Sequence, residues 1–398
     1  MSERERVGAD ADAAADADAL VAWSALAEPA DVGAAWLVAT LGPARALAWV
    51  RRVADNPVAA TMELAPIAPA AQVNEAFKIS EKWVARLDVA DPQAHRERAH
   101  KCGARVVVRG GAEWPRCLDD LGPVAPFALW VRGSGNLGAL MDNGIAIVGA
   151  RSATAYGEHV TSTIAAELAD RGATVVSGGA YGIDASAHRT ALAVGEPTVA
   201  VMAGGVDRLY PAGNSDMLER VLDGGVAVSE VPPGYAPHRA RFLSRNRVIA
   251  TARATVVVEA ALRSGALSTA RHAAAMIRPV GAVPGPVTSA SSAGCHGLIR
   301  DGLAQLVTCG ADVLALAEPL GSQGADAPRD EERDLRHEFA DTDQRQAYGA
   351  IGRRRAAVEG IAKEAGLTLA QTRAALGGLE MAGLARREAG LWVRREAR

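Results

Sequence analysis

The chain has 398 residues and a formal net charge of −3, and 49% of its residues are hydrophobic while only 4% are aromatic. A chain of this length is expected to form two or three globular domains with ample buried core. The N-terminal segment lacks the apolar region of a secretory signal, and no run of 18 apolar residues occurs. We therefore expect a cytoplasmic protein that does not span or bind a membrane.

The first 100 residues predict a tail followed by helices. Residues 1–18 are rich in Asp and Ala, which predicts a disordered tail. Residues 20–100 show helical periodicity and hold four of the seven tryptophans, which predicts a small helical domain resembling SAM or helix-hairpin-helix modules. A Gly-Pro pair at 42–43 is expected to separate two short helices. Packing is the commoner role for such a module, and contact with DNA backbones is the alternative.

Residues 101–318 predict a parallel sheet with helices on both faces. The runs "ARVVV", "FALWV", "GIAIV", "ATVVS", "TVAVM", "GVAVS" and "ATVVV" are short and continuously apolar, as in strands that are buried on both sides. Helical stretches separate these runs, and the clearest spans 156–171 before Gly172. Repeated strand and helix predict an α/β fold with a doubly wound parallel sheet.

The C-terminal end divides into an acidic and a basic part. Residues 319–344 are predicted to be a linker, because 321–344 hold 8 Asp or Glu against 3 Arg. Residues 345–398 hold 11 Lys or Arg against 5 Asp or Glu, and two helical patterns there precede a hairpin-like "GLARREAGLWVRR". This order resembles a winged helix, which predicts binding to nucleic acid, with a protein-binding module as the alternative.

The four cysteines, Cys102, Cys117, Cys295 and Cys309, show neither CxxC spacing nor a nearby pair of histidines. They predict free thiols in a reducing compartment, without a disulfide framework or a metal site.

The predicted binding site lies where the strands end. In doubly wound sheets, ligands bind beyond the carboxyl ends of the strands, near the point where strand order reverses. Glycine turns there bring backbone N–H groups toward a ligand, and the helix N-termini that follow favour phosphate. The turns in question supply the candidate residues Gly149, Arg151, Ser177, Gly178, Gly179, Tyr181, Gly182, Ser264 and Gly265.

Three arginines precede the last of these strands, in "RFLSRNR" at 241–247, and residues 235–258 contain no Asp or Glu. Uncompensated arginines beside glycine turns fit a polyanion that follows a groove. We therefore predict that Arg245 and Arg247 contact phosphates and that Asn246 holds their segment in shape. In the rival account these arginines pair with internal acids such as Glu230 or Glu259.

Several other site chemistries find no support in the sequence. The turn after "IAIVG" lacks G-x-G-x-x-G, and G-x-x-x-x-G-K-[ST] occurs nowhere, so no nucleotide cofactor is expected. Glu230 and Glu259 end strands and could act as bases, but buried strand-end carboxylates more often have a structural role. Because neither a paired acid nor a Ser/His/Asp set presents itself, we predict no catalytic residues, no metal and no enzyme activity.

Seven motifs occur in order between 144 and 303: "VGARSATAYG", "SGGAYGIDASAH", "AGGVDRLYP", "SRNRVIA", "VVVEAALRSGALSTAR", "VPGPV" and "GCHGLIRDG". Together they resemble the DprA/Smf family of DNA-processing proteins. The resemblance implies an extended Rossmann-like domain that binds single-stranded DNA, a homodimer, and the RecA recombinase as a partner loaded onto that DNA, for recombination and natural transformation. It also implies that the groove uses the residues named above.

Two departures from the family pattern affect the site. Gly179 and Tyr181 stand in a turn where the family has S-G-L-A-[KR]-G-I-D, so an aromatic ring that could stack on a base replaces a basic residue. Ala150 stands where Ser or Thr is usual, which removes a hydroxyl donor.

Two alternative functions stay open from the sequence. One is an enzyme related to nucleotide N-glycosidases, although the turn "SGALSTARHA" lacks their glutamate. The other is a transcription regulator with a winged helix and a nucleotide-sensing sheet.

Overall fold

The computed structural model describes residues 3–318, 342–351, 356–388 and 390–394, and the chain divides into two compact units, Met1–Pro319 and Leu320–Arg398. The predicted acidic linker at 319–344 lies outside the described residues except for its last three, which belong to a helix. In the described part of the chain, every helix is too short or too polar to cross a lipid bilayer.

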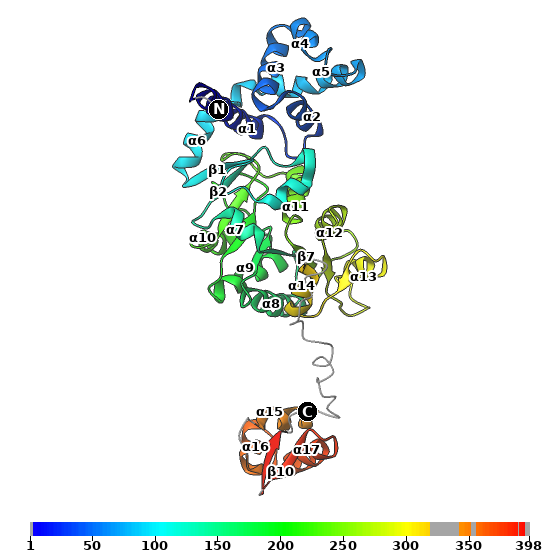
Figure 1. Ribbon diagram of the computed structural model, residues 1–398. Coiled ribbons are helices and arrows are strands. Elements are labelled where there is room, and N and C mark those ends of the chain that lie inside the picture. Colours follow the sequence, from blue (N-terminus) through cyan, green and yellow to red (C-terminus); the bar gives the residue numbers. More distant parts are fainter. Residues whose placement is uncertain (1–2, 319–341, 352–355, 389, 395–398) are drawn as a thin grey trace. The chain divides into compact units, whose positions relative to one another are not determined.

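The first unit starts with a group of helices, drawn in blue to cyan in Figure 1. Gly42, with φ of 83°, ends the second helix, and Pro43 begins the third, as the Gly-Pro pair predicts. Trp23, Trp49 and Trp83 are fully buried among these helices, so the tryptophans serve packing. The helices are α1 (Glu3–Leu26), α2 (Val32–Leu41), α3 (Pro43–Asp55), α4 (Pro57–Leu64), α5 (Ala70–Val84) and α6 (Pro92–Lys101), with a 3-10 turn η1 (Leu87–Val89).

The predicted disorder of residues 1–18 is wrong from residue 3 onward, because α1 begins at Glu3. Alanine has the highest helix propensity, which offsets the weaker propensity of the interspersed Asp. Two of these aspartates also have partners. Asp16 accepts a hydrogen bond of 3.0 Å from the amide of Ala44, and Asp18 pairs with Arg96 at 2.7 Å.

A nine-stranded sheet follows, with the order β1-β2-β6-β5-β4-β3-β7-β8-β9. The pairs from β6 to β9 are all parallel, whereas β1–β2 and β2–β6 are antiparallel. This confirms the predicted α/β fold with a mostly parallel sheet. The strands are β1 (Ala104–Val108), β2 (Ala128–Arg132), β3 (Gly144–Val148), β4 (Thr174–Ser177), β5 (Thr198–Val201), β6 (Val226–Ser229), β7 (Ala254–Val257), β8 (Val280–Ala282) and β9 (Gln305–Leu306).

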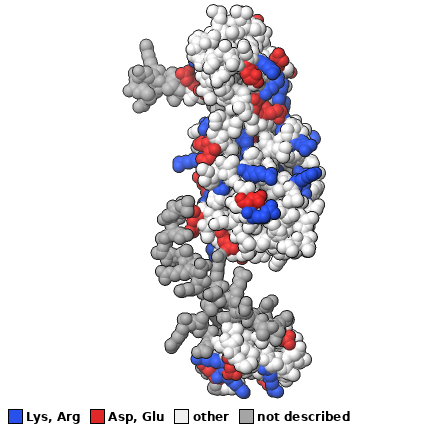
Figure 2. All heavy atoms as spheres, turned by 90° about the vertical axis from the view of Figure 1, so that its right-hand side faces the viewer, with Lys and Arg blue, Asp and Glu red and all other residues white. Residues whose placement is uncertain are grey.

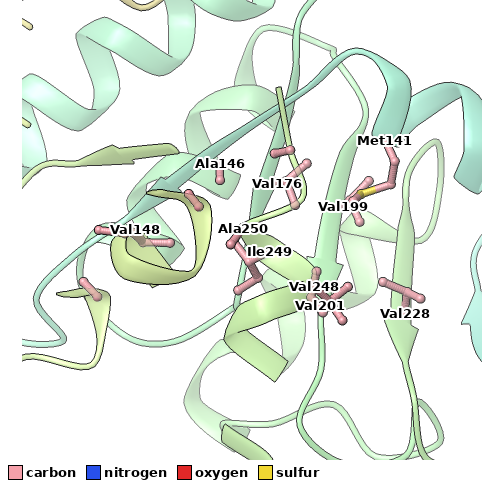
Figure 3. Packing of buried hydrophobic residues seen from close by; sticks show 14 of the residues in the cluster. Met141, Ala146, Val148, Val176, Val199, Val201, Val228, Val248, Ile249 and Ala250 are labelled. Atoms are coloured by element: carbon pink, nitrogen blue, oxygen red, sulfur yellow. The ribbon is translucent and has the colours of Figure 1, made fainter. Parts of the chain in front are cut away.

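Helices cover both faces of the sheet because successive strand residues point to opposite sides. Ile145 and Ile147 of β3 pack in one apolar cluster with Ile164, whereas Ala146 and Val148 pack in another with Val248, as Figure 3 shows for the second cluster. The covering helices are α7 (Leu137–Asp142), α8 (Ala155–Ala169), α9 (Ile183–Ala193), α10 (Ser215–Val221), α11 (Arg239–Ile249), α12 (Ala266–Ala275), α13 (Ala293–Arg300) and α14 (Gly310–Ala317), with 3-10 segments η2 (Arg116–Val124) and η3 (Ala212–Asn214).

The N-terminal helices and the sheet share one apolar cluster. Val21 of α1 and Ala99 of α6 pack in the same cluster as Trp130 of β2. The indole N–H of Trp130 also donates a 3.2 Å hydrogen bond to the hydroxyl of Ser24. Residues 20–100 and 101–318 therefore belong to one compact unit.

The second unit contains three helices and a short hairpin among its described residues. Gly366 ends α16 in the left-handed conformation, with φ of 67°, and Thr368 caps α17 by accepting from the amide of Gln371. Its apolar core includes Ile361, Leu376 and Leu379. The elements are α15 (Thr342–Ala350), α16 (Val358–Ala365), α17 (Leu369–Met381), β10 (Ala385–Glu388) and β11 (Leu391–Arg394). The two helices α16 and α17 and the hairpin lie where the sequence predicts them. The winged-helix assignment stays a prediction.

Candidate nucleic-acid interface

A groove opens where the strand order of the sheet reverses. From β3 the chain continues outward through β4, β5 and β6, and it then returns to place β7 on the other side of β3. Connections that leave neighbouring strands in opposite directions create a crevice beyond their carboxyl ends. The groove there has a volume of about 560 Å³. It is lined by Val148, Gly149, Arg151, Ala180, Asp184, Arg239, Phe242, Leu243, Arg245, Asn246, Ile249, Ser264, Gly265, Ala266 and Thr269.

Half of the twelve predicted site residues line this groove, and the other half do not. The lining residues come from the loop after β3, from α11 and from the loop after β7, so three separate segments meet at the predicted place. The lining residues are Gly149, Arg151, Arg245, Asn246, Ser264 and Gly265. The residues outside the lining are Ser177, Gly178, Gly179, Tyr181, Gly182 and Arg247.

Arg151 is an exposed cation that lines the groove. Its side chain is exposed, and among the described residues it makes no ion pair with an acid. The guanidinium carbon lies 5.4 Å from the centre of the Phe242 ring, a cation–π distance. Figure 2 shows one face of the molecule, on which basic side chains lie among acidic ones. A guanidinium that stacks on an aromatic ring keeps its N–H groups available for an anion.

Arg245 forms part of the groove floor. Its Nη1 donates to the carbonyl oxygens of Gly178, at 2.9 Å, and Val201. Burial lowers the pKa of Arg245 to about 10, while the charge of Asp184 acts to raise it. The side chain is therefore positively charged at neutral pH, but two of its hydrogen bonds are used inside the protein. Gly178 permits this arrangement, because a side chain at 178 would collide with the guanidinium.

The turn after β4 points its amides inward, contrary to the prediction. The N–H groups of Gly178 and Ala180 donate to one carboxylate oxygen of Asp184, at 3.1 and 3.4 Å. The hydroxyl of Ser177 donates to the carbonyl of Ile147 at 2.6 Å. These donors are thus used by the fold. Burial raises the pKa of Asp184, whereas Arg245 and the two amides act to lower it.

The remaining residues of this turn have conformational or surface roles. Gly179 and Gly182 have φ values of 67° and 75°, which favour glycine, and the carbonyl of Gly179 accepts from the side chain of Asn214 at 2.9 Å. Tyr181 is 47% exposed and lies against Gly213. Its ring is therefore accessible near the groove without lining it.

The structure contradicts the prediction for Arg247. Its Nη2 lies 2.5 Å from Oε2 of Glu230, and the two side chains are 5% and 10% exposed. Burial raises the pKa of Glu230, and the charge of Arg247 opposes this shift. The absence of acids from 235–258 misled the sequence argument, because this partner lies just before that stretch. For Arg247 the rival account is therefore the correct one.

Asn246 and Ser264 fix the walls of the groove. The side-chain amide of Asn246 donates to the carbonyl of Gly265 at 3.3 Å, which ties α11 to the loop after β7. The hydroxyl of Ser264 accepts from the amide of Ala266 at 3.3 Å, just before α12 begins. Gly265 itself is exposed, with open space where a side chain would stand.

Glu259, the other strand-end carboxylate, has a structural role. It is 2% exposed and accepts from the amide and hydroxyl of Thr154, at 2.9 and 2.7 Å, next to the N-terminus of α8. The hydroxyl of Ser291 donates to it at 3.2 Å. Because both carboxylate oxygens are engaged away from the groove, the geometry gives no support to an N-glycosidase-like reaction.

Metal and thiol chemistry also find no support in the described part of the chain. Its His, Cys, Asp and Glu side chains form no group of three or more that could hold a metal ion. The four cysteines are free thiols, as predicted. Burial raises the pKa of Cys295 to about 11, so this thiol is unreactive at neutral pH.

Of the nine groove-lining residues that sequence reasoning missed, three carry a charge or an aromatic ring: Asp184, Arg239 and Phe242. The signal for two of them was present, because Arg239, Phe242, Asn246 and Ile249 recur at helical spacing on one side of α11. Asp184 gave no such signal, because it is a single acidic residue in the first turn of α9.

The chain is similar in sequence to proteins of a known family. Residues 105–318 match the family described as DNA recombination-mediator protein A. A relative from Mycobacterium tuberculosis that carries the name DprA is 42% identical over 368 residues, which cover 88% of this chain and 94% of the relative. The DNA processing protein DprA of Streptococcus pneumoniae is 39% identical over 192 residues, or 48% of this chain and 67% of the relative.

A solved structure is similar as well. The X-ray structure of DNA processing protein A from Streptococcus pneumoniae superposes with a TM-score of 0.55 at 33% identity, and the match covers 60% of this chain and 83% of that chain. The chain belongs to the DNA recombination-mediator protein A (DprA/Smf) family.

Proposed function

We propose that the groove binds single-stranded DNA and that the protein is a non-enzymatic recombination mediator. The observation that carries this proposal is Arg151, an exposed arginine without an acidic partner among the described residues, stacked on Phe242 in a groove at the reversal of strand order. Arginine supplies phosphate contacts, and aromatic rings accept bases of any sequence. The name of the family, DNA recombination-mediator protein A, supports the same conclusion.

Further side chains around the groove fit a flexible, unpaired strand. Arg239 is exposed and lines the groove, so it adds a second cation. The ring of Tyr210 is 45% exposed and lies 5.8 Å from the ring of Phe242, centre to centre. The exposed ring of Tyr181 is a further stacking surface. Such rings suit the bases of a single strand, because the bases of a duplex are already stacked on one another.

RecA is the partner that we propose for the DNA-bound protein, and a homodimer is the proposed form. Both proposals rest on the resemblance of the seven motifs to the DprA/Smf family, as does a role in natural transformation. A cytoplasmic location follows from the same proposal, because RecA and its DNA substrate are found there. The C-terminal unit is proposed to be a winged helix that is not needed for the groove to bind DNA.

The binding proposal can be tested with oligonucleotides across salt concentrations. The wild type should bind single-stranded DNA more tightly than duplex, and the logarithm of affinity should fall linearly with the logarithm of salt. Arg151→Ala should weaken binding and lower that slope by about 0.7, the contribution of one phosphate on a single strand. Arg171→Ala is the matched control, because Arg171 is exposed and lies before β4, at the opposite edge of the sheet. Equal affinity of the wild type for both forms of DNA would contradict the proposal.

Removal of the second unit locates the site. A chain that ends at residue 319 should keep most of its affinity for single-stranded DNA, because all of the groove residues belong to the first unit. A folded truncated chain that no longer binds would place the main site in the C-terminal unit instead.

A further inference from the structure

One glutamate of the N-terminal helices holds the helix that lines the groove. Glu28 lies just beyond the end of α1, and Arg241 lies in the first turn of α11. Arg241 donates from Nε to Oε2 of Glu28 at 2.8 Å and from Nη2 to Oε1 at 2.7 Å. This bidentate geometry is the strongest and most directional form of an ion pair between side chains. The two residues are 213 positions apart in the chain, so the pair is purely tertiary.

Other groups converge on the same carboxylate. Arg86 donates to Oε1 of Glu28 at 3.2 Å, and Nε2 of His238 lies 3.6 Å from Oε2. Tyr235 lies beneath Arg241, with the guanidinium carbon 5.3 Å from the ring centre, and its hydroxyl donates to the carbonyl of Ala25. Partial burial acts to raise the pKa of Glu28, but Arg241 and Arg86 outweigh it and lower this pKa below its usual value. Glu28 is therefore ionised near neutral pH.

The position of Arg241 within α11 explains why this matters for the groove. Arg239 precedes it by two residues and Phe242 follows it directly, and both line the groove. Because a helix turns by 100° per residue, Arg241 lies on a different side of α11 from these two residues. The side chain of Arg241 is 8% exposed and is thus enclosed between the helices and the sheet. One side of α11 is fixed while the other is open to a ligand.

We propose that Glu28 is a positioning residue for the groove: it fixes Arg241 and thereby sets where the first turn of α11 presents Arg239 and Phe242. The proposal rests on the proposed function for its effect on DNA binding. It gives the N-terminal helices a role at the site although none of their residues lines the groove. Residues that act through such contacts change binding by about 2- to 30-fold.

The sign of the effect separates positioning from simple electrostatics. Glu28→Gln removes a negative charge, which by long-range attraction alone should tighten binding to DNA. The positioning role predicts the opposite, an affinity for a poly-dT oligonucleotide that is about 2- to 30-fold weaker. The salt slope should stay unchanged, because no phosphate contact is removed. Glu63→Gln is the matched control: Glu63 pairs with Arg45 and Arg52 within the N-terminal helices, so this variant loses the same charge and should bind as the wild type or slightly more tightly.

A second variant keeps the test informative if Glu28→Gln folds poorly. Glu28→Asp retains the charge but shortens the side chain, so it cannot span to Arg241 in the same bidentate geometry. Electrostatics alone predicts wild-type affinity for this variant, whereas positioning predicts a loss. Wild-type or tighter binding by both variants would overturn the proposal.

A measurement without DNA distinguishes this proposal from the proposed function. Amide hydrogen exchange in α11 should speed up in Glu28→Gln and Glu28→Asp, while exchange in α8 should not change. If the wild type fails to bind single-stranded DNA, the proposed function is wrong, and faster exchange in α11 would still support the positioning role. Unchanged exchange in α11 would refute that role whatever the DNA result.

Discussion

The two sides of α11 use the same residue type in opposite ways. On the buried parts of the helix surface, Arg241 and Arg247 pair with Glu28 and Glu230, two carboxylates that come from other segments. On the surface that faces the groove, Arg239 makes no ion pair among the described residues, and neither does Arg151, which lines the same groove. An excess of arginine along a chain thus locates a charged helix. Which of its sides is free for a ligand depends on acids that the local sequence does not contain.

The largest effect is expected on the paired side. Glu230→Ala would leave Arg247 as a buried charge without a partner, which should lower the free energy of unfolding by about 3–5 kcal/mol. Urea denaturation at neutral pH measures this loss. Glu219→Ala is the control, because Glu219 pairs with Arg132 but is 55% exposed, and its loss should cost at most about 1 kcal/mol. If the two variants are equally stable, then burial of the Arg247–Glu230 pair does not increase its contribution to the free energy of unfolding.

A smaller effect is expected beneath the groove, where His188 is fully buried. Burial, and then the nearby charges of Arg245 and Arg189, lower the pKa of His188 to about 3. The folded protein therefore keeps this ring neutral, whereas the unfolded chain binds a proton below its ordinary pKa near 6.5. Stability is lost as pH falls below about 6.5, and by pH 5 the loss should reach about 2 kcal/mol.

His188→Asn isolates this contribution. The amide of Asn can replace the Nδ1 group of His188, which lies 2.8 Å from the hydroxyl of Thr198, but it does not titrate. Buried carboxyls with raised pKa values, such as Asp184 and Glu230, act with the opposite sign in both proteins. The difference between wild type and variant from pH 7 to pH 5, measured by urea denaturation, is therefore the test. Parallel pH profiles would show that His188 is accessible to protons in the folded state.

The smallest effect on stability is expected on the open side. Arg239→Ala should change the free energy of unfolding by no more than about 0.5 kcal/mol, because the side chain is exposed and unpaired among the described residues. The same change should lower the salt slope of single-stranded DNA binding by about 0.7. Thermal unfolding and salt-dependent binding measure the two quantities. A destabilised Arg239→Ala variant with an unchanged slope would reverse the comparison between the two sides of α11.

Much of the fold could be predicted from the sequence because buried parallel strands leave a strong pattern. All seven apolar runs form strands where expected, and the predicted helix at 156–171 is α8. No comparable pattern marks β8 and β9, which have only three and two residues. The helix that begins at Glu3 was missed because its acidic, low-complexity composition is also typical of disorder.

The site was predictable only in part, for a physical reason. Gly149 and Arg151 lie within three residues of the end of β3, so the sheet fixes their place at its carboxyl edge. The pairing of Arg247 with Glu230 depends on side chains brought together by tertiary packing. Position along a strand is encoded locally, but the pairing of a buried polar group is not.

The buried indole of Trp130 limits how far the chain can be shortened from its N-terminal end. Its ring packs with Val21 and Ala99, and its N–H donates to Ser24. A fragment that starts at residue 101 lacks these partners, so the Trp130 side chain on β2 would become exposed to solvent. The opposite end differs, because the chain changes from one compact unit to the other at 319–320. A fragment that carries the groove must therefore retain the chain from before Val21 to the end of the first unit, whereas the second unit is dispensable for folding of the sheet.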